Sequence, residues 1–248
     1  MAVTRPAILL LPQATELEWR IRPRLEEWAD VSSYDPPGVG SEPRRDGPPF
    51  EVRLGLAAEQ LDRAGWDRCV LVADGWSTPI AAHLALARRS AVAGLVLTHA
   101  TVSYRIGGER PDVNQEVWEA FNQLVASDAR NFVLYGLGQF TGGSYDEALV
   151  DEILERAPAS TIQRLMAETI DVGPIDDVLA QLDIPLLFVK HEGCLQWTDE
   201  GYANAVAAFP RAKTGSVSQA PPVSEEFADM LRQFCAELDW VMETNQLS

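Results

Sequence analysis

The chain has 248 residues, of which 46% are hydrophobic, and a formal net charge of −17 at pH 7. This length suits one domain, or one core that carries an insertion, with enough apolar side chains for a sizeable core. A surface of this charge repels nucleic-acid phosphates, so binding of DNA or RNA is disfavoured. Because the acidic residues are spread along the chain, we interpret them as a solvated surface that aids solubility.

The cysteines and the apolar runs indicate in which cellular environment the protein works. Cys69, Cys194 and Cys235 lie far apart, and such an odd, sparse set predicts neither a disulfide framework nor a zinc site. We therefore expect no metal and no cofactor. The apolar run near the N-terminus is too short for a secretory signal, and no segment approaches the roughly 18 apolar residues of a membrane span. We expect a cytoplasmic protein without a membrane partner, and the oligomeric state stays open, a homodimer included.

Strand and helix patterns alternate over the first hundred residues. Short apolar runs that are typical of strands buried on both faces occur at 7–11, 31–34, 69–73 and 93–98. Amphipathic or apolar helical patterns occur at 19–28, 50–64 and 78–89. This alternation predicts right-handed βαβ crossovers and a mostly parallel sheet with helices on both faces.

The alternation stops at residue 102 and resumes at residue 183. Between them, helical patterns with apolar stripes predict a helical cap over the carboxyl ends of the strands, where ligands bind in such sheets. The core then consists of residues 1–101 and 183–248. The elements predicted after the cap are strands at 185–189 and 212–218 and helices at 199–209 and 224–242. Together these runs predict a sheet of about six strands.

Four segments resemble those of the α/β-hydrolase superfamily. A-I-L-L-L-P-Q is similar to the strand that leads to the oxyanion loop, and Y-D-P-P-G-V-G-S to the turn D-x-P-G-x-G-x-S. The strand–turn–helix around Gly75 resembles the nucleophile elbow, and P-L-L-F-V-K-H-E-G-C resembles the strand before the catalytic acid. The resemblance covers nearly the whole chain. It implies an α/β-hydrolase fold whose usual N-terminal hairpin is missing.

At the elbow the family pattern is small-x-nucleophile-x-small, because the nucleophile sits in a strained turn. With Gly75 at the centre, Ala73 and Ser77 fill the small positions. D-G-W-S-T-P-I is then similar to the elbow of dehalogenase-like and epoxide-hydrolase-like members, H-D-W-G-G-P-I, with Trp76, Pro79 and Ile80 at the matching positions. In this register the nucleophile has become a glycine, which has no side chain to attack with.

Two other registers are possible for the elbow. Asp74 at the centre would put Val72 and Trp76 at the small positions, which is a poor fit. Ser77 at the centre gives G-W-S-T-P, which is close to G-x-S-x-G but has Pro79 in place of the last glycine. This last register stays open as an alternative.

The rest of the catalytic triad is missing from its expected places. Cys194 stands where the resemblance puts the catalytic acid, and the segment after the last predicted strand has no histidine to act as the base. Pro12-Gln13 replaces the His-Gly of the oxyanion loop, although the backbone N–H of Ala14 could still donate there. Because a Ser-His-Asp mechanism needs both a base and an acid, we predict a degenerate triad and a pseudohydrolase.

Other side chains are candidates for binding or proton transfer. His99 ends a strand beside the elbow and is a candidate base, although a histidine hydrogen-bonded at a strand end is the competing interpretation. Asp74 could pair with it, but strand alternation points Asp74 away from the side that Gly75 faces. His191 is expected in an exposed loop that borders the pocket. The predicted pocket residues are Gln13, Ala14, Gly75, Trp76, His99, Tyr104, His191 and Cys194.

The sequence therefore supports three hypotheses for function. The first is a protein that binds a small hydrophobic molecule in a hydrophobic pocket between core and cap and performs non-hydrolytic chemistry, as a cofactor-free lyase, isomerase or cyclase. The second is a pseudoenzyme that binds a ligand without chemistry. The third is a hydrolase that works through Ser77, or through His99 and an activated water.

Overall fold

The computed structural model describes residues 5–99, 115–134, 147–172, 175–192, 198–238 and 240. Its six strands pair in parallel in the order β2-β1-β3-β4-β5-β6. They are β1 (Ala7–Leu11), β2 (Asp30–Ser32), β3 (Cys69–Asp74), β4 (Val92–Thr98), β5 (Leu186–His191) and β6 (Lys213–Val217). The predicted parallel sheet of about six strands is confirmed.

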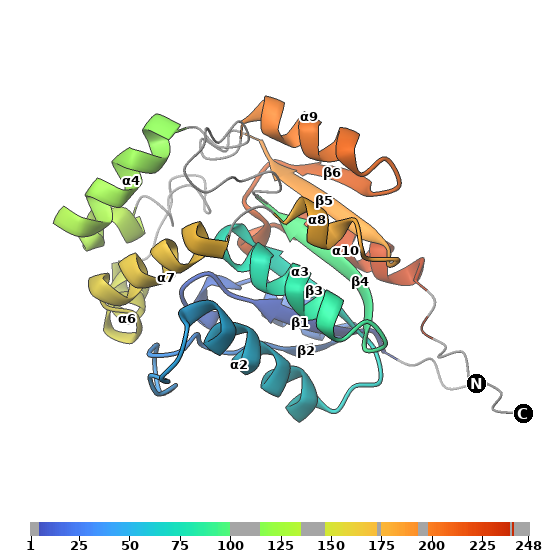
Figure 1. The fold of residues 1–248 in the computed structure, drawn as a ribbon, viewed down its shortest axis with the longest axis horizontal. Helices are drawn as coiled ribbons and strands as arrows, with labels where there is room; N and C mark the ends of the chain where they lie inside the picture. The colour runs from blue at the N-terminus through green and yellow to red at the C-terminus, as the bar shows by residue number, and fades with distance from the viewer. Residues whose placement is uncertain are drawn as a thin grey trace, which may run out of the picture.

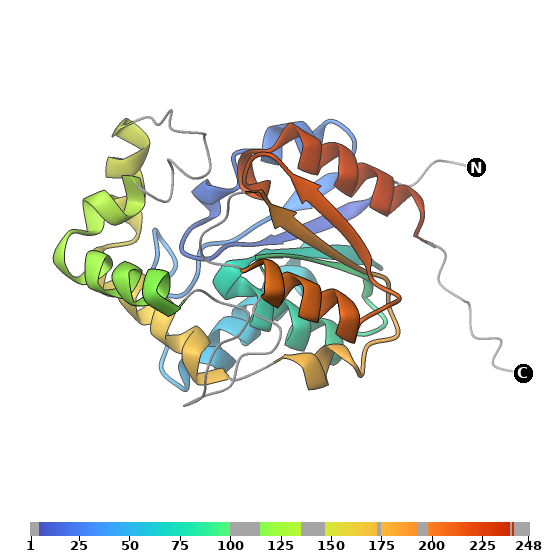
Figure 2. The ribbon, with the colours of Figure 1, turned by 90° about the horizontal axis from the view of Figure 1, so that it is seen from above.

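Helices cover both faces of this sheet (Figures 1 and 2). One face carries α2 (Pro49–Ala64), α3 (Thr78–Ala87), α8 (Asp176–Leu179) and α9 (Asp199–Ala208). The other face carries α1 (Arg22–Glu26) and α10 (Glu225–Ala236). This arrangement explains why the strand sequences are apolar without alternation, because both faces of each central strand are buried.

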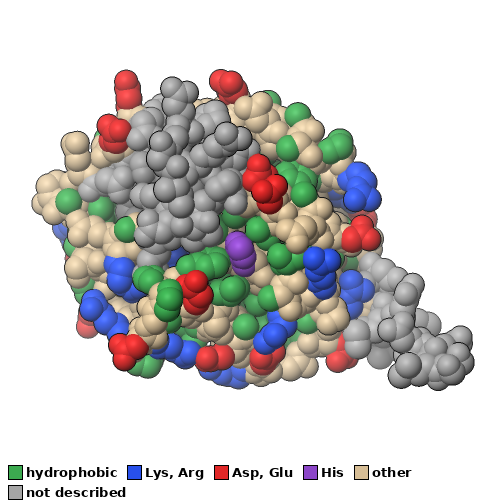
Figure 3. Space-filling model, in the orientation of Figure 1, with side chains coloured by type: hydrophobic (Ala, Val, Ile, Leu, Met, Phe, Trp, Pro, Cys, Tyr) green, Lys and Arg blue, Asp and Glu red, His purple; other side chains and the backbone are tan. Residues whose placement is uncertain are grey.

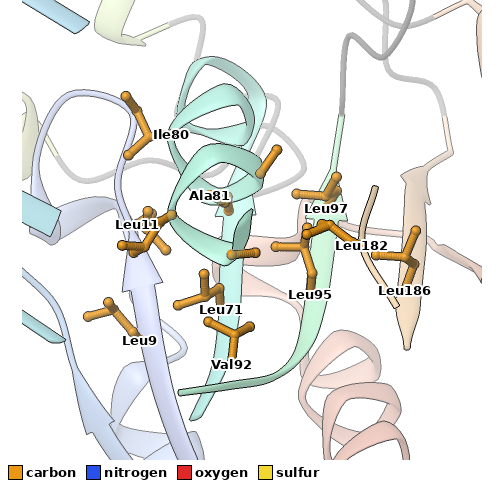
Figure 4. Packing of buried hydrophobic residues seen from close by; sticks show 14 of the residues in the cluster. Leu9, Leu11, Leu71, Ile80, Ala81, Val92, Leu95, Leu97, Leu182 and Leu186 are labelled. Atoms are coloured by element: carbon orange, nitrogen blue, oxygen red, sulfur yellow. The ribbon is translucent and has the colours of Figure 1, made fainter. Parts of the chain in front are cut away.

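The core lies on both sides of the sheet. Successive side chains of a strand point to opposite faces, so Leu9 and Leu11 pack under α3 with Leu71, Ile80 and Ala81 (Figure 4). On the opposite face, Phe227, Leu231 and Phe234 of α10 share one buried cluster with strand residues Ile8, Leu10, Val70, Val72 and Val96. Each fully buried large apolar side chain contributes about 1.5–3 kcal/mol. This packing fixes the strand ends on which the site is built.

The registers bring four strand ends together. Leu11 of β1 lies beside Ala73 of β3, and Asp74 at the end of β3 lies beside Thr98 of β4. Thr98 in turn lies beside Val189 of β5. Because β2 lies on one side of β1 and β3 on the other, the chain reverses direction across the sheet between β1 and β3. In open α/β sheets, ligands bind at the carboxyl ends of the strands near such a reversal.

Three described helices of the segment between β4 and β5 lie together beyond this end of the sheet (Figures 1 and 2). They are α4 (Gln115–Ser127), α6 (Glu147–Arg156) and α7 (Ala159–Val172). Their buried apolar residues pack with Ala14 and Trp76 of the core in one cluster. The predicted helical patterns at 102–114 and 135–146 lie outside the described residues, and the division into core and cap stays a prediction.

Two arginines attach these helices to the Y-D-P-P-G-V-G-S turn. Arg156 of α6 lies 3.2 Å from a carboxylate oxygen of Asp35, and its carbonyl accepts a hydrogen bond of 2.8 Å from the Gly40 N–H. Arg164 of α7 donates to the carbonyl of Pro37 at 2.5 Å. The turn therefore connects the helical segment to the strand ends.

The surface mixes charges of both signs. Figure 3 shows acidic and basic side chains interspersed over the face seen in Figure 1, with hydrophobic side chains between them. Within the described part of the chain, no helix has the length and apolar character that crossing a membrane requires.

Candidate functional site

The elbow is a sharp strand–turn–helix at the centre of the sheet. β3 ends at Asp74, the 3-10 turn η2 covers Gly75–Ser77, and α3 begins at Thr78. Gly75 has φ +47°, a left-handed conformation that glycine adopts without the steric cost of a Cβ atom. Pro79 lies in the first turn of α3, where its missing N–H costs nothing. The structure thus places Gly75 at the apex.

The side chain of Gln13 covers this apex. A Cβ atom at position 75 would lie 2.5 Å from Oε1 and 2.8 Å from Cδ of Gln13, which is closer than real contacts allow. The backbone N–H of Trp76 donates to Oε1 of Gln13 at 3.4 Å, and Nε2 of Gln13 donates to Asp74 at 2.5 Å. The Gln13 carboxamide therefore fills the space into which an elbow nucleophile would project.

The carboxylate of Asp74, at the end of β3, accepts hydrogen bonds from three side chains. Besides Gln13, it accepts hydrogen bonds from the hydroxyl of Thr98 and, at 2.8 Å, from Nδ1 of His99. The Asp74 side chain is only 2% exposed. The expectation that alternation points Asp74 away from the side that Gly75 faces does not remove Asp74 from the site, because Gln13 lies over Gly75 and donates to Asp74, and the His99 ring also contacts Asp74.

His99 follows directly after β4 in a strained backbone conformation. Its φ of +50° makes it the one non-glycine residue with positive φ in the described ranges. For an L-residue this conformation costs roughly 1–2 kcal/mol. The Asp74 carboxylate holds the ring, which is 9% exposed. Strain of this kind is concentrated at functional sites.

His191 is the second histidine at this edge of the sheet. Its ring centroid lies 5.8 Å from that of His99, at an interplanar angle of 68°. The prediction of an exposed loop histidine is wrong, since β5 extends to His191 and buries it to 7% exposure. Burial, and then the neighbouring His99, lower the pKa of His191 below its ordinary value.

Several solved structures share this architecture over most of their length. A bromoperoxidase from Bacillus anthracis matches with a TM-score of 0.77 and 17% identity, over 94% of this chain and 93% of that one. An esterase from a Rhodococcus species matches with a TM-score of 0.72 and 17% identity, over 96% and 93%. A 2-hydroxy-6-oxo-6-phenylhexa-2,4-dienoate hydrolase from Rhodococcus matches with a TM-score of 0.71 and 16% identity, over 93% and 89%.

The chain has the α/β-hydrolase fold. No family model matches the sequence, and none of the curated proteins does. At these identities the likeness concerns the fold, and function must be argued from the site.

In the α/β-hydrolase fold, the oxyanion is bound by two backbone N–H groups, one after the nucleophile and one in the loop after the first core strand. Here both are engaged within the chain. The Trp76 N–H donates to Gln13, and the Ala14 N–H donates to Oε1 of Glu18 at 2.7 Å. The expectation that Ala14 could donate to a ligand is therefore contradicted by this contact.

Glu18 holds the loop after β1 in place. It accepts hydrogen bonds from the backbone N–H groups of Gln13 at 2.9 Å and Thr15 at 3.2 Å, in addition to that of Ala14. With the Thr15 side chain it forms a capping box on the 3-10 turn η1 (Glu16–Glu18). This loop conformation is what aims the Gln13 carboxamide at Gly75.

We expect Glu18 to make the protein less stable as the pH rises from about 4.5 to about 7. Burial raises the pKa of Glu18 to about 7 from 4.5, against the three backbone donors, which lower it. The folded state binds the proton of the Glu18 carboxyl more tightly than the unfolded state does. The stabilisation that this bound proton gives is therefore fully present below pH 4.5 and is lost as the pH passes 7. The loss is on the order of 3 kcal/mol.

Urea unfolding at pH 4.5, 6 and 7.5 measures this effect. Glu18→Gln should flatten the dependence, because glutamine does not titrate, whereas Glu26→Gln at the exposed end of α1 should leave it as in the wild type. An equal slope in the wild type and Glu18→Gln would show that Glu18 titrates normally.

The hydroxyl of Ser77 faces the interior. Ser77 is 1% exposed, and its Oγ lies 2.7 Å from the carbonyl of Leu11 and 2.9 Å from that of Asp74, to which it donates. It also accepts a hydrogen bond of 3.1 Å from the backbone N–H of Asp74. These contacts tie the turn to β1 and leave Ser77 in a structural role in this geometry.

The remaining candidates are distributed around the edge of the site. Trp76 is 9% exposed and stacks on Phe132 with 6.4 Å between the ring centroids. Tyr104 and Cys194 lie outside the described residues. His83 of α3 packs against Phe50 of the neighbouring helix α2. Among the residues that the structure describes, no cluster of His, Cys, Asp and Glu side chains could hold a metal ion.

Proposed function

We propose that this protein binds a small hydrophobic molecule at the carboxyl ends of β1, β3 and β4 and transfers protons to and from it through His99. No covalent bond to the elbow is formed. The observation that carries the proposal is the Asp74–His99 hydrogen bond beside an apex that is glycine. Lyases, isomerases and cyclases are reaction classes that need neither a nucleophile nor a cofactor when proton transfer suffices.

Asp74 fixes the tautomer of His99 that proton transfer requires. Its carboxylate accepts from Nδ1, so the neutral ring carries its basic lone pair on Nε2. The same carboxylate stabilises the imidazolium that forms when the proton is taken, as an aspartate does for a catalytic histidine. Positioned general bases of this kind accelerate reactions by about 10²–10⁴-fold.

The apolar cluster beside the elbow supports a hydrophobic ligand. Ala14 and Trp76 pack there with Val125, Ile153 and Leu165 of the helices beyond the strand ends. Apolar walls exclude water, which strengthens the electrostatic interactions of a buried proton-transfer group. This environment suits a small molecule with an acidic C–H bond rather than a charged substrate.

Hydrolysis is the second candidate function, because an esterase and a hydrolase are among the proteins of similar structure. It would require Ser77 or a water activated by His99. The internal contacts of Ser77, and the engagement of both oxyanion donors by Gln13 and Glu18, favour the first proposal. A protein that binds the ligand without chemistry would lack any acceleration by His99.

The probe 5-nitrobenzisoxazole tests for a base in an apolar site. A base removes its ring C–H proton, the N–O bond breaks and a nitrile and a phenolate form, with no ester and no water involved. We expect the wild-type rate to exceed that of free imidazole at equal concentration and to rise with pH as the imidazole loses its proton. His99→Asn should lower this rate by about 100-fold.

His83→Asn is the matched control, since this histidine lies on α3 away from Asp74 and should leave the rate unchanged. An unchanged rate in His99→Asn would reject His99 as the base. A wild-type rate no faster than that of free imidazole would favour binding without chemistry. Cleavage of 4-nitrophenyl butyrate that is lost in Ser77→Ala would favour the hydrolase.

A further inference from the structure

The Gln13 carboxamide is held in one orientation by two contacts. Its Oε1 accepts a hydrogen bond of 3.4 Å from the Trp76 N–H, and its Nε2 donates to the Asp74 carboxylate at 2.5 Å. A backbone N–H can only donate and an ionised carboxylate can only accept, so the amide oxygen must face Trp76 and the amide nitrogen must face Asp74. The proposed function gives this oriented amide no part in binding the ligand.

One N–H of this amide has no partner within the described part of the chain. The nitrogen of a glutamine side chain carries two hydrogens, and the bond to Asp74 uses one of them. No residue that the structure describes accepts the other. Gln13 is only partly buried, whereas the nearby Ser77 is 1% exposed and its hydroxyl is bound to backbone groups. The second N–H is therefore a donor for a molecule bound at the strand ends.

The surroundings of Gln13 determine which chemical group this donor suits. Ala14 and Trp76 belong to the apolar cluster beside the elbow, and in apolar sites a few polar groups fix the orientation of the ligand. The Asp74 carboxylate is bound to the same nitrogen, so an anionic group of the ligand would be repelled by its charge. An N–H group of the ligand would face another donor. A neutral carbonyl oxygen meets neither obstacle.

The bond at the amide oxygen strengthens the donor at the amide nitrogen. Hydrogen bonds in a chain polarise one another, so acceptance from the Trp76 N–H at Oε1 makes the Nε2 hydrogens better donors. The glycine at position 75 leaves room for this arrangement, since a Cβ atom there would lie 3.2 Å from Nε2 and 2.5 Å from Oε1 of Gln13.

We infer that Gln13 binds the carbonyl oxygen of a neutral, hydrophobic ketone through this second N–H. In the α/β-hydrolase fold, two backbone N–H groups bind such an oxygen. Here the corresponding N–H groups of Trp76 and Ala14 are engaged within the chain, and the Gln13 side chain takes over their task. The inference rests on the proposed function for the place where the ligand binds. It requires no proton transfer by His99.

Two bicyclic probes that differ by one carbonyl group, 1-indanone and indane, test this inference. Isothermal titration calorimetry measures the dissociation constants of both probes for the wild type and for Gln13→Met, which keeps the length of the side chain without an N–H. Gln13→Met should weaken the binding of 1-indanone relative to that of indane by about tenfold. In NMR spectra of the wild type, 1-indanone should shift the side-chain amide signals of Gln13 much more than indane does.

Gln13→Glu repeats the test if the methionine variant unfolds. A protonated glutamate gives its one hydrogen to Asp74 and an ionised glutamate has none, so this variant should lose the same preference. Gln181→Met is the matched control, since Gln181 is exposed and donates to the carbonyl of Asp177 at 2.9 Å; it should keep the wild-type ratio of dissociation constants.

The outcomes separate this inference from the proposed function. A ratio of dissociation constants that is unchanged in the Gln13 variants would overturn the inference, as would Gln13 amide signals that 1-indanone does not shift, while binding of indane would still support a hydrophobic site. Binding of neither probe to the wild type would contradict the hydrophobic site of the proposed function itself.

Discussion

Asp74→Asn is expected to slow the reaction of 5-nitrobenzisoxazole by about 100-fold or more and to lower the free energy of unfolding by about 2–4 kcal/mol. The carboxylate accepts from Gln13, Thr98 and His99. An asparagine offers one oxygen and one NH₂ group, so at least one of these donors would face another donor in a buried place. The neutral amide also no longer stabilises the imidazolium of His99.

The rate and a urea unfolding curve measure the two effects on the same preparation. Asp62→Asn is the control, since Asp62 is exposed and pairs with Arg88 at 3.2 Å on the surface. It should change stability by less than about 1 kcal/mol and leave the rate as it is. If Asp74→Asn retained the wild-type rate, the role of Asp74 in proton transfer would be refuted, whatever the change in stability.

Gly75→Ala is expected to lower the free energy of unfolding by about 2–4 kcal/mol. About 1–2 kcal/mol comes from the positive φ, which a Cβ atom disfavours. The remainder comes from displacing the Gln13 carboxamide, which would lie 2.5 Å from the new methyl group. The displacement also breaks the hydrogen bonds from Trp76 to Gln13 and from Gln13 to Asp74.

A double-mutant cycle with Gln13→Ala separates these two causes. In the Gln13→Ala background, Gly75→Ala should cost only the conformational part. Gly65→Ala is the matched control, because Gly65 ends α2 with φ +65° and has nothing within 4 Å of its would-be Cβ atom. Equal costs of Gly75→Ala in both backgrounds would show that Gln13 does not occupy the apex.

The strands could be predicted because both of their faces are buried. Ala7–Leu11 was predicted with its bounds, and β3 and β4 differ from the prediction by one residue. β5 was predicted too short, since it continues through the polar residues Lys190 and His191 after its apolar run ends. A run of apolar residues ends where the strand leaves the hydrophobic core. The pattern therefore does not predict polar residues that continue the strand beyond the core and into a site.

The contacts of the site were harder to predict, because they join loops that are far apart in the sequence. Gln13 meets Asp74 across 61 positions, and no local pattern predicts this contact. The role of Glu18 has a local signal in the sequence, since T-E-L-E at Thr15–Glu18 matches the capping box S/T-x-x-E. Asp74 and His99 follow from parallel pairing, which places the ends of β3 and β4 side by side.

Treatment with a fluorophosphonate, followed by intact-mass and peptide analysis, tests most directly whether the elbow carries a nucleophile. We predict no adduct on the folded protein, because Gly75 has no side chain and the Ser77 hydroxyl is hydrogen-bonded to the backbone in the interior. A stoichiometric adduct on Ser77 that disappears in Ser77→Ala would contradict this prediction.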